Sequence, residues 1–446
     1  MAQARFSHDS ETLKSIAADA LAHARAKGAS ACEAEVADGY GQTVTVRKGE
    51  VETIEYNRDK SLSVTVYLGK QKGYASTADL AARAIRDTVE AALTIARFTA
   101  VDDSAGLPDP EELAGESADL DLFHPWDLPV ERAIEIARSC ESAAFALDKR
   151  VSNSEGASVS CQQWHFILAN SLGFMDGFAT SRHSLSCAVI AVERGAMQRD
   201  DWYVSKRAPE NLARPEAVGE YAGRRALARL GSRKIKTAQV PVLFEAPVAI
   251  DLLGQFVSAV SGGSLYRKAS FLLDSLGQQV FSAMVNIAER PHLPRGGASS
   301  WFDDEGVATR EREVVRQGVL QGYFMGSYSA RKLGMKTTGS AGGNHNLILQ
   351  GGELDLPGLI RKMRRGLLVT ELMGHGVNMV TGDYSRGAAG YWVEGGEIRH
   401  PVEEITIAGN LRDMFRAIVA IGGDALTRGS RTSGSILIEK MTLAGN

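Results

Sequence analysis

Residues 32–76 alternate apolar and polar side chains over a long run, and this pattern restricts the fold of the N-terminal part most strongly. Glycine interrupts the run at residues 48–49 and again at 69–70. Alternation with a period of two is typical of strands that bury one face, and glycine permits the positive φ that tight hairpin turns need. The sequence therefore predicts an antiparallel meander here.

Two helices are expected on either side of this meander. Apolar residues recur at intervals of three and four over residues 11–27, and Gly28 ends the pattern. This spacing places the apolar side chains along one face of an amphipathic helix. Residues 78–98 are predicted to form the second helix.

The same order of elements returns after a linker rich in Asp, Glu, Pro and Gly, at residues 101–128. A helix is expected at 130–147, strands at 151–202 and another helix at 215–230. The repetition suggests an internal duplication, but no residue-level repeat accompanies it, and two unrelated units would show the same pattern.

The pattern changes beyond Lys236 to short strands, short helices and dense glycine. Gly395-Gly396 is expected to join two strands in a two-residue hairpin. We therefore predict an α+β fold whose C-terminal part is mixed, mostly antiparallel and β-rich. The expected divisions are a first α+β unit at 1–100, a linker at 101–128, a second α+β unit at 129–235 and the β-rich domain at 236–446.

Charge and cysteine content exclude several classes of protein. There are 50 Lys and Arg against 54 Asp and Glu, a net charge of −4, which disfavours nucleic acid as a partner. No stretch approaches the ~20 apolar residues of a membrane span, and the N-terminus has no apolar signal region. The four cysteines form no C-x-x-C pair, as is typical of reduced cytosolic thiols. We expect a cytoplasmic protein without a membrane segment. The cysteines are Cys32, Cys140, Cys161 and Cys187.

The nine histidines do not form a recognisable metal motif, because no H-E-x-x-H pair exists. A site could still be assembled from His345, His375 and a carboxylate such as Glu371 or Asp383. Isolated loop histidines, satisfied by backbone or water, are the simpler interpretation.

Signals for nucleophilic catalysis and phosphate binding are weak. No G-x-S-x-G elbow is present, and Cys187 has only His183 on the same face of its predicted strand, where core packing is the usual role of a cysteine. Residues 339–345, GSAGGNH, resemble an anion-binding nest but lack a Walker lysine. Nucleotide binding is not expected.

Three polar residues lie in a glycine-rich stretch near the predicted C-terminal hairpin. Asp383, Tyr384 and Arg386 are bracketed by Gly382 and Gly387. Such groups could meet an extended peptide at an accessible sheet edge. A tight turn held by an ion pair between Asp383 and Arg386 is an equal alternative.

Several segments together resemble the TldD/PmbA family, and specifically its PmbA subgroup, also called TldE. The similarity extends over nearly the whole chain rather than over one motif. The segments are VRKGEVETIEYN at 46–57, DLDLFHP at 119–125, TSRHSLS at 180–186, GGSLYRKASFLLDSLGQ at 262–278, SYSARKLG at 327–334, TGSAGGNHN at 338–346 and TGDYSRGAAGYWVEGGEIRHPVEEITIAGN at 381–410.

This resemblance implies a heteromeric metallopeptidase of bacteria and archaea. The TldD subunit carries zinc on an H-E-x-x-x-H helix and a later cysteine, and the PmbA subunit pairs with it. In this chain the corresponding positions are Gly254, Gln255 and Ala259, with Ser433 near the cysteine position. Glycine and alanine cannot ligate a metal, so no catalytic or metal-binding residue is expected in this chain, and zinc is expected in the partner.

The resemblance also implies a role in the degradation or processing of unfolded and small peptides. The chain would complete the substrate cleft and stabilise a TldD-like, zinc-bearing paralogue, and in isolation it could form a homodimer. The candidate cleft residues are His345, His375, Asp383, Tyr384 and Arg386. One alternative is a self-sufficient hydrolase with a site around His345, His375 and Asp383. Another is a structural or regulatory module without a peptidase connection.

Overall fold

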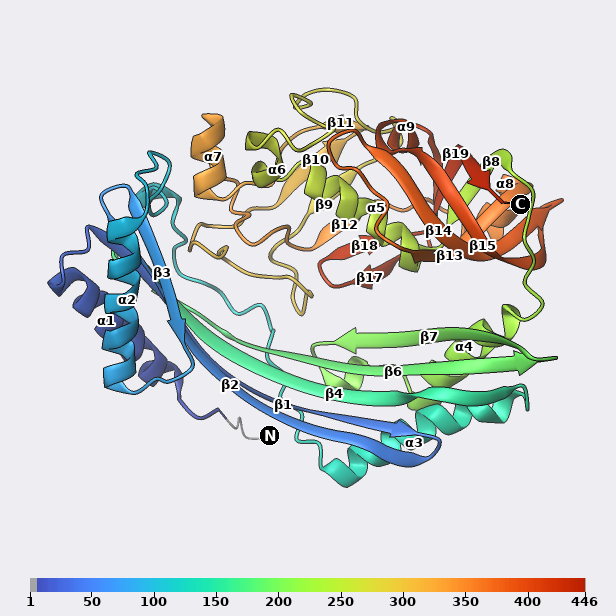
Figure 1. Ribbon diagram of the computed structural model, residues 1–446, viewed down its shortest axis with the longest axis horizontal. Helices are drawn as coiled ribbons and strands as arrows, with labels where there is room; N and C mark the ends of the chain where they lie inside the picture. The colour runs from blue at the N-terminus through green and yellow to red at the C-terminus, as the bar shows by residue number, and fades with distance from the viewer. Residues whose placement is uncertain (1–5, 446) are drawn as a thin grey trace.

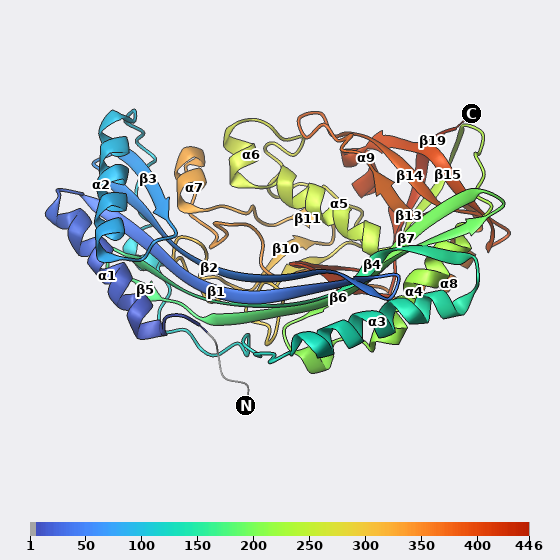
Figure 2. The ribbon, with the colours of Figure 1, turned by 60° about the horizontal axis from the view of Figure 1, so that its bottom comes forward.

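The N-terminal half of the chain forms a long curved sheet, and the C-terminal half lies over its concave side (Figure 1). The computed structural model describes residues 6–445. Four long helices cover the convex side of the sheet (Figure 2). The predicted α+β fold class is confirmed.

The curved sheet is antiparallel and has the strand order β3-β2-β1-β4-β6-β7, with the short β5 paired to β4. It contains the predicted meander, with turns at Gly49 and Gly69. Its strands are β1 (Ala31–Arg47), β2 (Glu50–Leu68), β3 (Gln71–Thr77), β4 (Val151–Asn170), β5 (Met175–Asp176), β6 (Ala179–Glu193) and β7 (Ala196–Lys206).

Each half of the curved sheet has two helices of its own. The predicted helices are confirmed, and their bounds differ by only a few residues from the expected ones. Helices α1 and α2 share one core with β1 and β2, while α3 and α4 share a second core with β4 and β6. The helices are α1 (Ser10–Ala26), α2 (Ala82–Phe98), α3 (Val130–Leu147) and α4 (Pro215–Ala228), and two short 3-10 helices occupy Pro110–Glu112 and Pro209–Asn211.

The two halves meet where β1 pairs with β4, from Glu33 opposite Asn170 to Val46 opposite Ala157. On either side of this pair the order is the same, with two further meander strands and two helices. Duplication of one helix-meander-helix unit would produce this arrangement, and the duplication remains our prediction. The divisions near residues 100 and 235 also remain a proposal.

Strand alternation separates the two faces of the curved sheet. On β1, Cys32, Ala34 and Val36 are fully buried beneath the helices. Glu35 and Ala37 point to the opposite, concave face. The apolar stripes of the helices thus fix which face of each strand is left for the C-terminal half.

The C-terminal region contains a closed barrel and a second sheet. Strand β19 pairs with both β8 and β15, so the order β15-β14-β13-β8-β19 closes into a five-stranded ring. The second sheet has the order β11-β10-β9-β12-β18-β17. Only the pairs β8–β13 and β12–β18 are parallel among the described strands of this region, as expected for a mostly antiparallel region.

The strands of this region are β8 (Ala238–Phe244), β9 (Ile287–Glu289), β10 (Arg312–Arg316), β11 (Val319–Leu320), β12 (Leu347–Leu349), β13 (Arg365–Met373), β14 (Asp383–Glu394), β15 (Glu397–Asn410), β16 (Ile418–Ile421), β17 (Leu426–Arg428), β18 (Arg431–Ser433) and β19 (Ile436–Ala444). Its helices are α5 (Ala246–Ala259), α6 (Gly262–Tyr266), α7 (Ser327–Leu333), α8 (Leu356–Met363) and α9 (Leu411–Arg416).

The predicted hairpin between β14 and β15 is confirmed. Glu394 pairs with Glu397, and Gly395 and Gly396 between them have φ values of 66° and 79°. A two-residue turn with positive φ at both central positions favours glycine, because other residues are strained there.

None of the helices within residues 6–445 combines the length and the apolar character that a membrane crossing requires.

Candidate functional site

A large cleft, here called the central cleft, lies between the concave face of the curved sheet and loops of the C-terminal region. Its volume is about 680 Å³. Trp164, Phe166 and Phe178 contribute aromatic surface from the sheet side, and Phe302 contributes it from the opposite loop. The rings of Phe166 and Phe178 meet edge to face with centroids 4.9 Å apart. The sheet side of the cleft therefore offers an aromatic patch, which lies beside polar side chains such as Gln162 and Arg182.

The opposite wall is built from residues 298–304 and from the glycine-rich loop 341–345. Asp303 shapes this wall, because its Oδ2 accepts a hydrogen bond from the Ala341 N–H at 2.9 Å. Its Oδ1 accepts bonds from the N–H groups of Glu305 and Val307, both at 3.0 Å. Burial raises the pKa of Asp303 to about 7 despite these bonds. The GSAGGNH segment therefore forms a wall of the cleft, bonded to Asp303 at Ala341.

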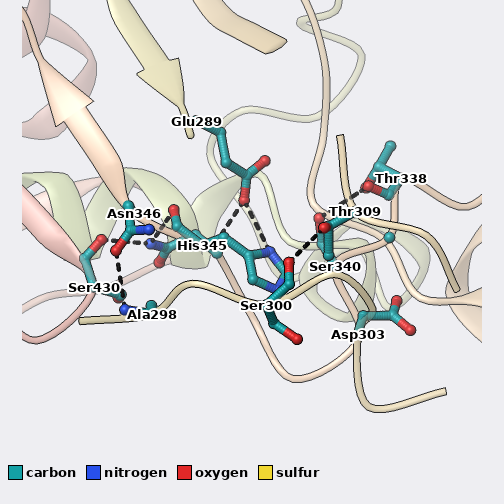
Figure 3. A network of polar contacts seen from close by, with 12 residues as sticks. Glu289, Ala298, Ser300, Asp303, Thr309, Thr338, Ser340, His345, Asn346 and Ser430 are labelled. Atoms are coloured by element: carbon teal, nitrogen blue, oxygen red, sulfur yellow. Dashed lines mark hydrogen bonds and ion pairs between the residues drawn. The ribbon is translucent and has the colours of Figure 1, made fainter. Parts of the chain in front are cut away.

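His345 lies in this wall and is held by a buried carboxylate (Figure 3). Its Nδ1 is 3.5 Å from Glu289 Oε1, and its backbone N–H donates to the same oxygen at 2.7 Å. Arg312 Nε donates to the other oxygen, Oε2, at 2.6 Å. Burial alone would raise the pKa of Glu289, but the bonds from His345 and Arg312 hold it below its ordinary value.

The hydroxyl groups in this network are already engaged (Figure 3). Ser300 Oγ donates to the Phe302 carbonyl at 2.5 Å, and Thr309 Oγ1 donates to the Ser300 carbonyl at 2.6 Å. A catalytic hydroxyl must give its proton to a base such as histidine. His345 and Glu289 therefore resemble a base and its orienting carboxylate, but both hydroxyls bond backbone carbonyls, and the histidine that contacts one of them is His292, whose Nε2 is 3.0 Å from Thr309 Oγ1.

The other four predicted cleft residues lie elsewhere. His375 is exposed in the loop after β13, and Asp383, Tyr384 and Arg386 lie on β14. The structure therefore brings only His345 to the central cleft.

Two expectations about Asp383, Tyr384 and Arg386 were wrong. They form no turn with an internal ion pair, because residues 383 and 386 lie on opposite faces of a strand. Arg386 Nη1 instead donates to Asp251 Oδ2 at 2.6 Å. They do not occupy an accessible edge either, because β15 covers one side and residues 376–378 cover the other.

Asp383 and Tyr384 have local structural contacts. Thr381 Oγ1 donates to Asp383 Oδ2 at 2.6 Å, and this bond holds the pKa of the carboxyl below its usual range. Tyr384 is only 1% exposed and belongs to the main core, where burial raises its pKa.

The positions that carry zinc ligands in a TldD-type chain lie on two elements that pack together, α5 and β18. Gly254, Gln255 and Ala259 are on α5, and Ser433 is on β18. Ser433 is fully buried, and its Oγ donates to the Gly434 carbonyl at 2.7 Å. The α5–β18 pair therefore provides one framework for these four positions.

An arginine from β18 fills the space in front of this framework. A Cβ atom added at Gly254 would lie 3.2 Å from Arg431 Nη1. Burial lowers the pKa of Arg431, an effect that the charge of Asp251 opposes. Its Nε is buried without a hydrogen-bond partner among the described residues. Sequence analysis missed Arg431, although it stands only two residues before Ser433.

These residues do not fit zinc. Gly254 and Ala259 have no side-chain donor atom, the Ser433 hydroxyl is committed to a carbonyl, and the Arg431 guanidinium repels a cation. Across residues 6–445, no three or more His, Cys, Asp or Glu side chains gather in a group that could hold a metal ion.

The Cys187 and His183 pair is part of the core. Both side chains are fully buried in the curved-sheet half. The His183 ring meets Trp126 edge to face at 5.3 Å, and its Nε2 is 2.8 Å from the His124 carbonyl oxygen. This environment corresponds to packing, as expected for a strand cysteine.

Comparison with known families accounts for almost all of the described chain. Residues 32–96 match the PmbA/TldA metallopeptidase domain 1. Residues 123–230 match the central domain of the same family, and residues 237–445 match its C-terminal domain.

Individual relatives agree with this assignment. The chain is 49% identical to the metalloprotease PmbA of Escherichia coli O157:H7, over 95% of this chain and 94% of the relative. A crystal structure from Bacteroides thetaiotaomicron, described as a proposed modulator of DNA gyrase, is 27% identical with a TM-score of 0.93, covering 98% of this chain and 100% of that one. TldE from Thermococcus kodakarensis shares the fold, with 19% identity and a TM-score of 0.82, covering 96% and 100% of the two chains. The chain therefore belongs to the PmbA/TldD family of metallopeptidases.

Proposed function

We propose that this chain is the non-zinc subunit of a cytosolic two-subunit metallopeptidase that degrades or processes unfolded and small peptides. A TldD-like paralogue would carry the zinc. The observation that carries this proposal is the α5–β18 framework, where Arg431 fills the space in front of Gly254 and no metal donor set remains. The chain keeps the family fold but has lost the metal donors.

The central cleft suits a peptide of varied sequence. Its aromatic surface can pack against many side chains. His345 is the cleft candidate that the geometry favours, because Glu289 fixes its ring. His375, Asp383, Tyr384 and Arg386 remain candidates only for a cleft that the partner extends over β14.

A surface for the partner is available on β2. Residues 50–60 pair with β1 on one side, whereas the pairing with β3 begins at Leu62. Val51, Ile54 and Tyr56 are exposed along this edge, with Tyr56 69% exposed. Unpaired edges with apolar side chains tend to recruit another chain. A paralogue, or a second copy in a homodimer, would cover this edge.

Reconstitution tests the proposal. The isolated chain should neither bind zinc stoichiometrically nor cleave unfolded casein. Addition of a TldD-like, H-E-x-x-x-H paralogue from the same genome should give a stable complex with zinc and chelator-sensitive cleavage. The readouts are metal content, analytical centrifugation and release of peptides. Chelator-sensitive proteolysis by the isolated chain would overturn the proposal and favour the self-sufficient hydrolase around His345, His375 and Asp383.

A further inference from the structure

A second cavity, here called the arginine cavity, opens beside the central cleft and shares Ser181, Arg182 and Arg207 with it. Its volume is about 540 Å³. The strands β6 and β7, residues 293–297 and the turn at 427–429 form its walls. Its lining contains four arginines and no Asp or Glu, although acidic residues outnumber basic ones in the whole chain. The arginines are Arg182, Arg207, Arg295 and Arg428.

Arg207 is held entirely by neutral groups. Its guanidinium donates to the carbonyls of Gly296 and Gly297 at 3.0 to 3.2 Å, to the Ser181 carbonyl at 3.3 Å and to the Thr180 hydroxyl. Burial and the neighbouring Arg182 lower its pKa to about 10. These contacts fix the position of the positive charge, but they leave that charge without a counterion.

Arg182 and Arg428 add two more positive charges. Arg182 pairs across the sheet with Gln162, which lines the central cleft, so both lie on the concave face. Its one hydrogen bond goes from Nη2 to the Gly297 carbonyl at 3.0 Å. Arg428 stacks 3.5 Å from the centroid of the Tyr203 ring and donates to the Tyr203 carbonyl at 2.6 Å. Within residues 6–445, no carboxylate forms an ion pair with Arg182, Arg207 or Arg428.

Arg295 differs from these three because acidic residues neutralise it. Its Nε is 2.5 Å from Asp121 Oδ2, and its Nη1 is 3.6 Å from Glu210 Oε1. The chain thus pairs Arg295 with acids at the rim of this cavity and leaves the other three arginines without an ion pair among the described residues, although the charge of Asp201 acts on Arg428.

We propose that Arg182, Arg207 and Arg428 form a site for carboxylate groups of a peptide whose backbone lies in the central cleft. The inference rests on the proposed function, because it requires that the cleft holds peptides. A planar guanidinium matches a carboxylate in a bidentate pair, and the free N–H groups of Arg182 can donate to it. The carboxylate comes from the peptide C-terminus or from an Asp or Glu side chain. Arg207 contributes its charge rather than free donors.

The test measures binding of synthetic octapeptides to the full chain by calorimetry at low ionic strength. The reference peptide contains alanine, glycine and three glutamates and has a free C-terminus. A second version has an amidated C-terminus, a third has glutamine in place of glutamate, and a fourth has both changes. We expect the fourth, uncharged peptide to bind at least about tenfold more weakly than the reference. The second and third versions assign the effect to the C-terminus or to side chains.

Arginine variants distinguish a specific carboxylate site from a general attraction between opposite charges. Arg182→Gln combined with Arg428→Gln should weaken the reference peptide about tenfold and leave the uncharged peptide unchanged. The control Arg295→Gln removes one positive charge from the same cavity, and it should change binding by less than about twofold because Asp121 and Glu210 already neutralise that charge. Melting temperatures verify that each variant folds.

Four outcomes would overturn the inference. Equal binding of the charged and uncharged peptides would show that the cavity does not recognise carboxylates, and this comparison needs no variant. If Arg295→Gln weakened binding of the reference peptide as much as the double variant does, the attraction would be nonspecific. Displacement of the peptide by a single-stranded oligonucleotide that binds more tightly would assign the cavity to nucleic acid. A reconstituted complex that cleaves peptides regardless of their charge would leave the proposed function standing without this site.

Discussion

Helices α4 and α5 follow one another along the chain and both contain 14 residues, yet Gly219 of α4 and Gly254 of α5 have different structural roles. A Cβ atom at Gly219 of α4 would lie 1.8 Å from the backbone oxygen of Cys140, so α3 and α4 touch through their backbones. A Cβ atom at Gly254 of α5 would meet only the end of the Arg431 side chain, at 3.2 Å. The first glycine permits close packing, whereas the second leaves room for a side chain.

The two helices also differ in how the buried arginine beside each of them is paired with carboxylates. Arg225 of α4 bonds Asp200 Oδ1 at 2.9 Å and both oxygens of Glu245 at 3.0 Å. Burial alone would lower its pKa, but the two carboxylates raise it above the ordinary value. Arg431, which faces α5, has a lowered pKa and an unpartnered Nε.

The contrast between Arg225 and Arg431 shows which of these two regions joins the halves of the protein. The Arg225 cluster ties the curved-sheet half to the C-terminal half, because Glu245 precedes α5 while Arg225 and Asp200 lie in the curved-sheet half. Its charges are therefore matched. At the α5–β18 framework, Arg431 has no such paired carboxylates among the described residues, and only the charge of Asp251 opposes the effect of burial on its pKa.

The largest effect is expected when the matched cluster is broken. Arg225→Met should lower the free energy of unfolding by about 3–5 kcal/mol, because it leaves Glu245 buried without its counterion and Asp200 with only Arg229, whose Nη1 is 3.5 Å from Asp200 Oδ2. The control Arg224→Met removes an exposed arginine next in sequence and should change stability by less than about 1 kcal/mol. Urea denaturation measures both. A loss below about 1 kcal/mol for Arg225→Met would mean that the two halves are held together by other contacts.

The comparison of the two glycines can be tested directly. Gly219→Ala should destabilise the protein by about 1–3 kcal/mol, because the new methyl group overlaps the Cys140 carbonyl and helices α3 and α4 must separate.

Gly254→Ala is the matched variant. It should be neutral or stabilising by up to about 1 kcal/mol, because alanine favours a helix and the Arg431 end can move aside. Thermal melts of Gly219→Ala and Gly254→Ala measure both changes in stability. Equal losses at the two positions would show that Gly254 also has a packing role, and the contrast between the helices would fail.

A smaller effect concerns buried histidine in the curved-sheet half. Burial lowers the pKa of His183, and its Nδ1 has no partner among the described residues. The folded pKa lies below the unfolded value of ~6.5, so the stability contribution is present above pH ~6.5 and is lost as pH falls towards the folded pKa. The slope from this one group is at most about 1.4 kcal/mol per pH unit.

His183→Gln should remove this slope between pH 7 and the acid limb, as measured by denaturation at a series of pH values. The control is His375→Gln in the C-terminal region, where the side chain is exposed. That variant should keep the wild-type pH dependence. Identical slopes for wild type and His183→Gln would contradict the prediction.

The smallest effect is expected from the most extensive change. Gly254→His, Gln255→Glu and Ala259→His together with Ser433→Cys should not create a peptidase. Restored ligands need supporting residues that hold them within about 0.5 Å, and the guanidinium of Arg431 lies next to the first of them.

A fifth substitution, Arg431→Ala, should allow weak zinc uptake without turnover, because it removes the competing cation. Metal analysis and peptide cleavage with and without chelator test both variants. Efficient cleavage by the fourfold variant would show that Arg431 does not block the site and that the supporting residues have persisted.

Much of the local structure follows from the sequence alone. The alternating run at 32–76 and the apolar spacing at 11–27 each depend on neighbours within a few residues, so their strands and helix were predictable. The Gly395-Gly396 turn was predictable because positive φ at two successive positions favours glycine. The absence of metal ligands at Gly254 and Ala259 also required only residue identity.

The tertiary structure alone determined which distant residues these elements contact. Arg431 reaches Gly254 across a gap of well over a hundred residues, and His345, in a loop, is held by Glu289 of β9. Barrel closure by β19 on β15, the central cleft and the arginine cavity depend on such distant contacts. Periodicity determines which face of an element is apolar, but it carries no information on which distant residue covers that face. The opposite roles of Gly219 and Gly254 therefore appear only in the folded protein.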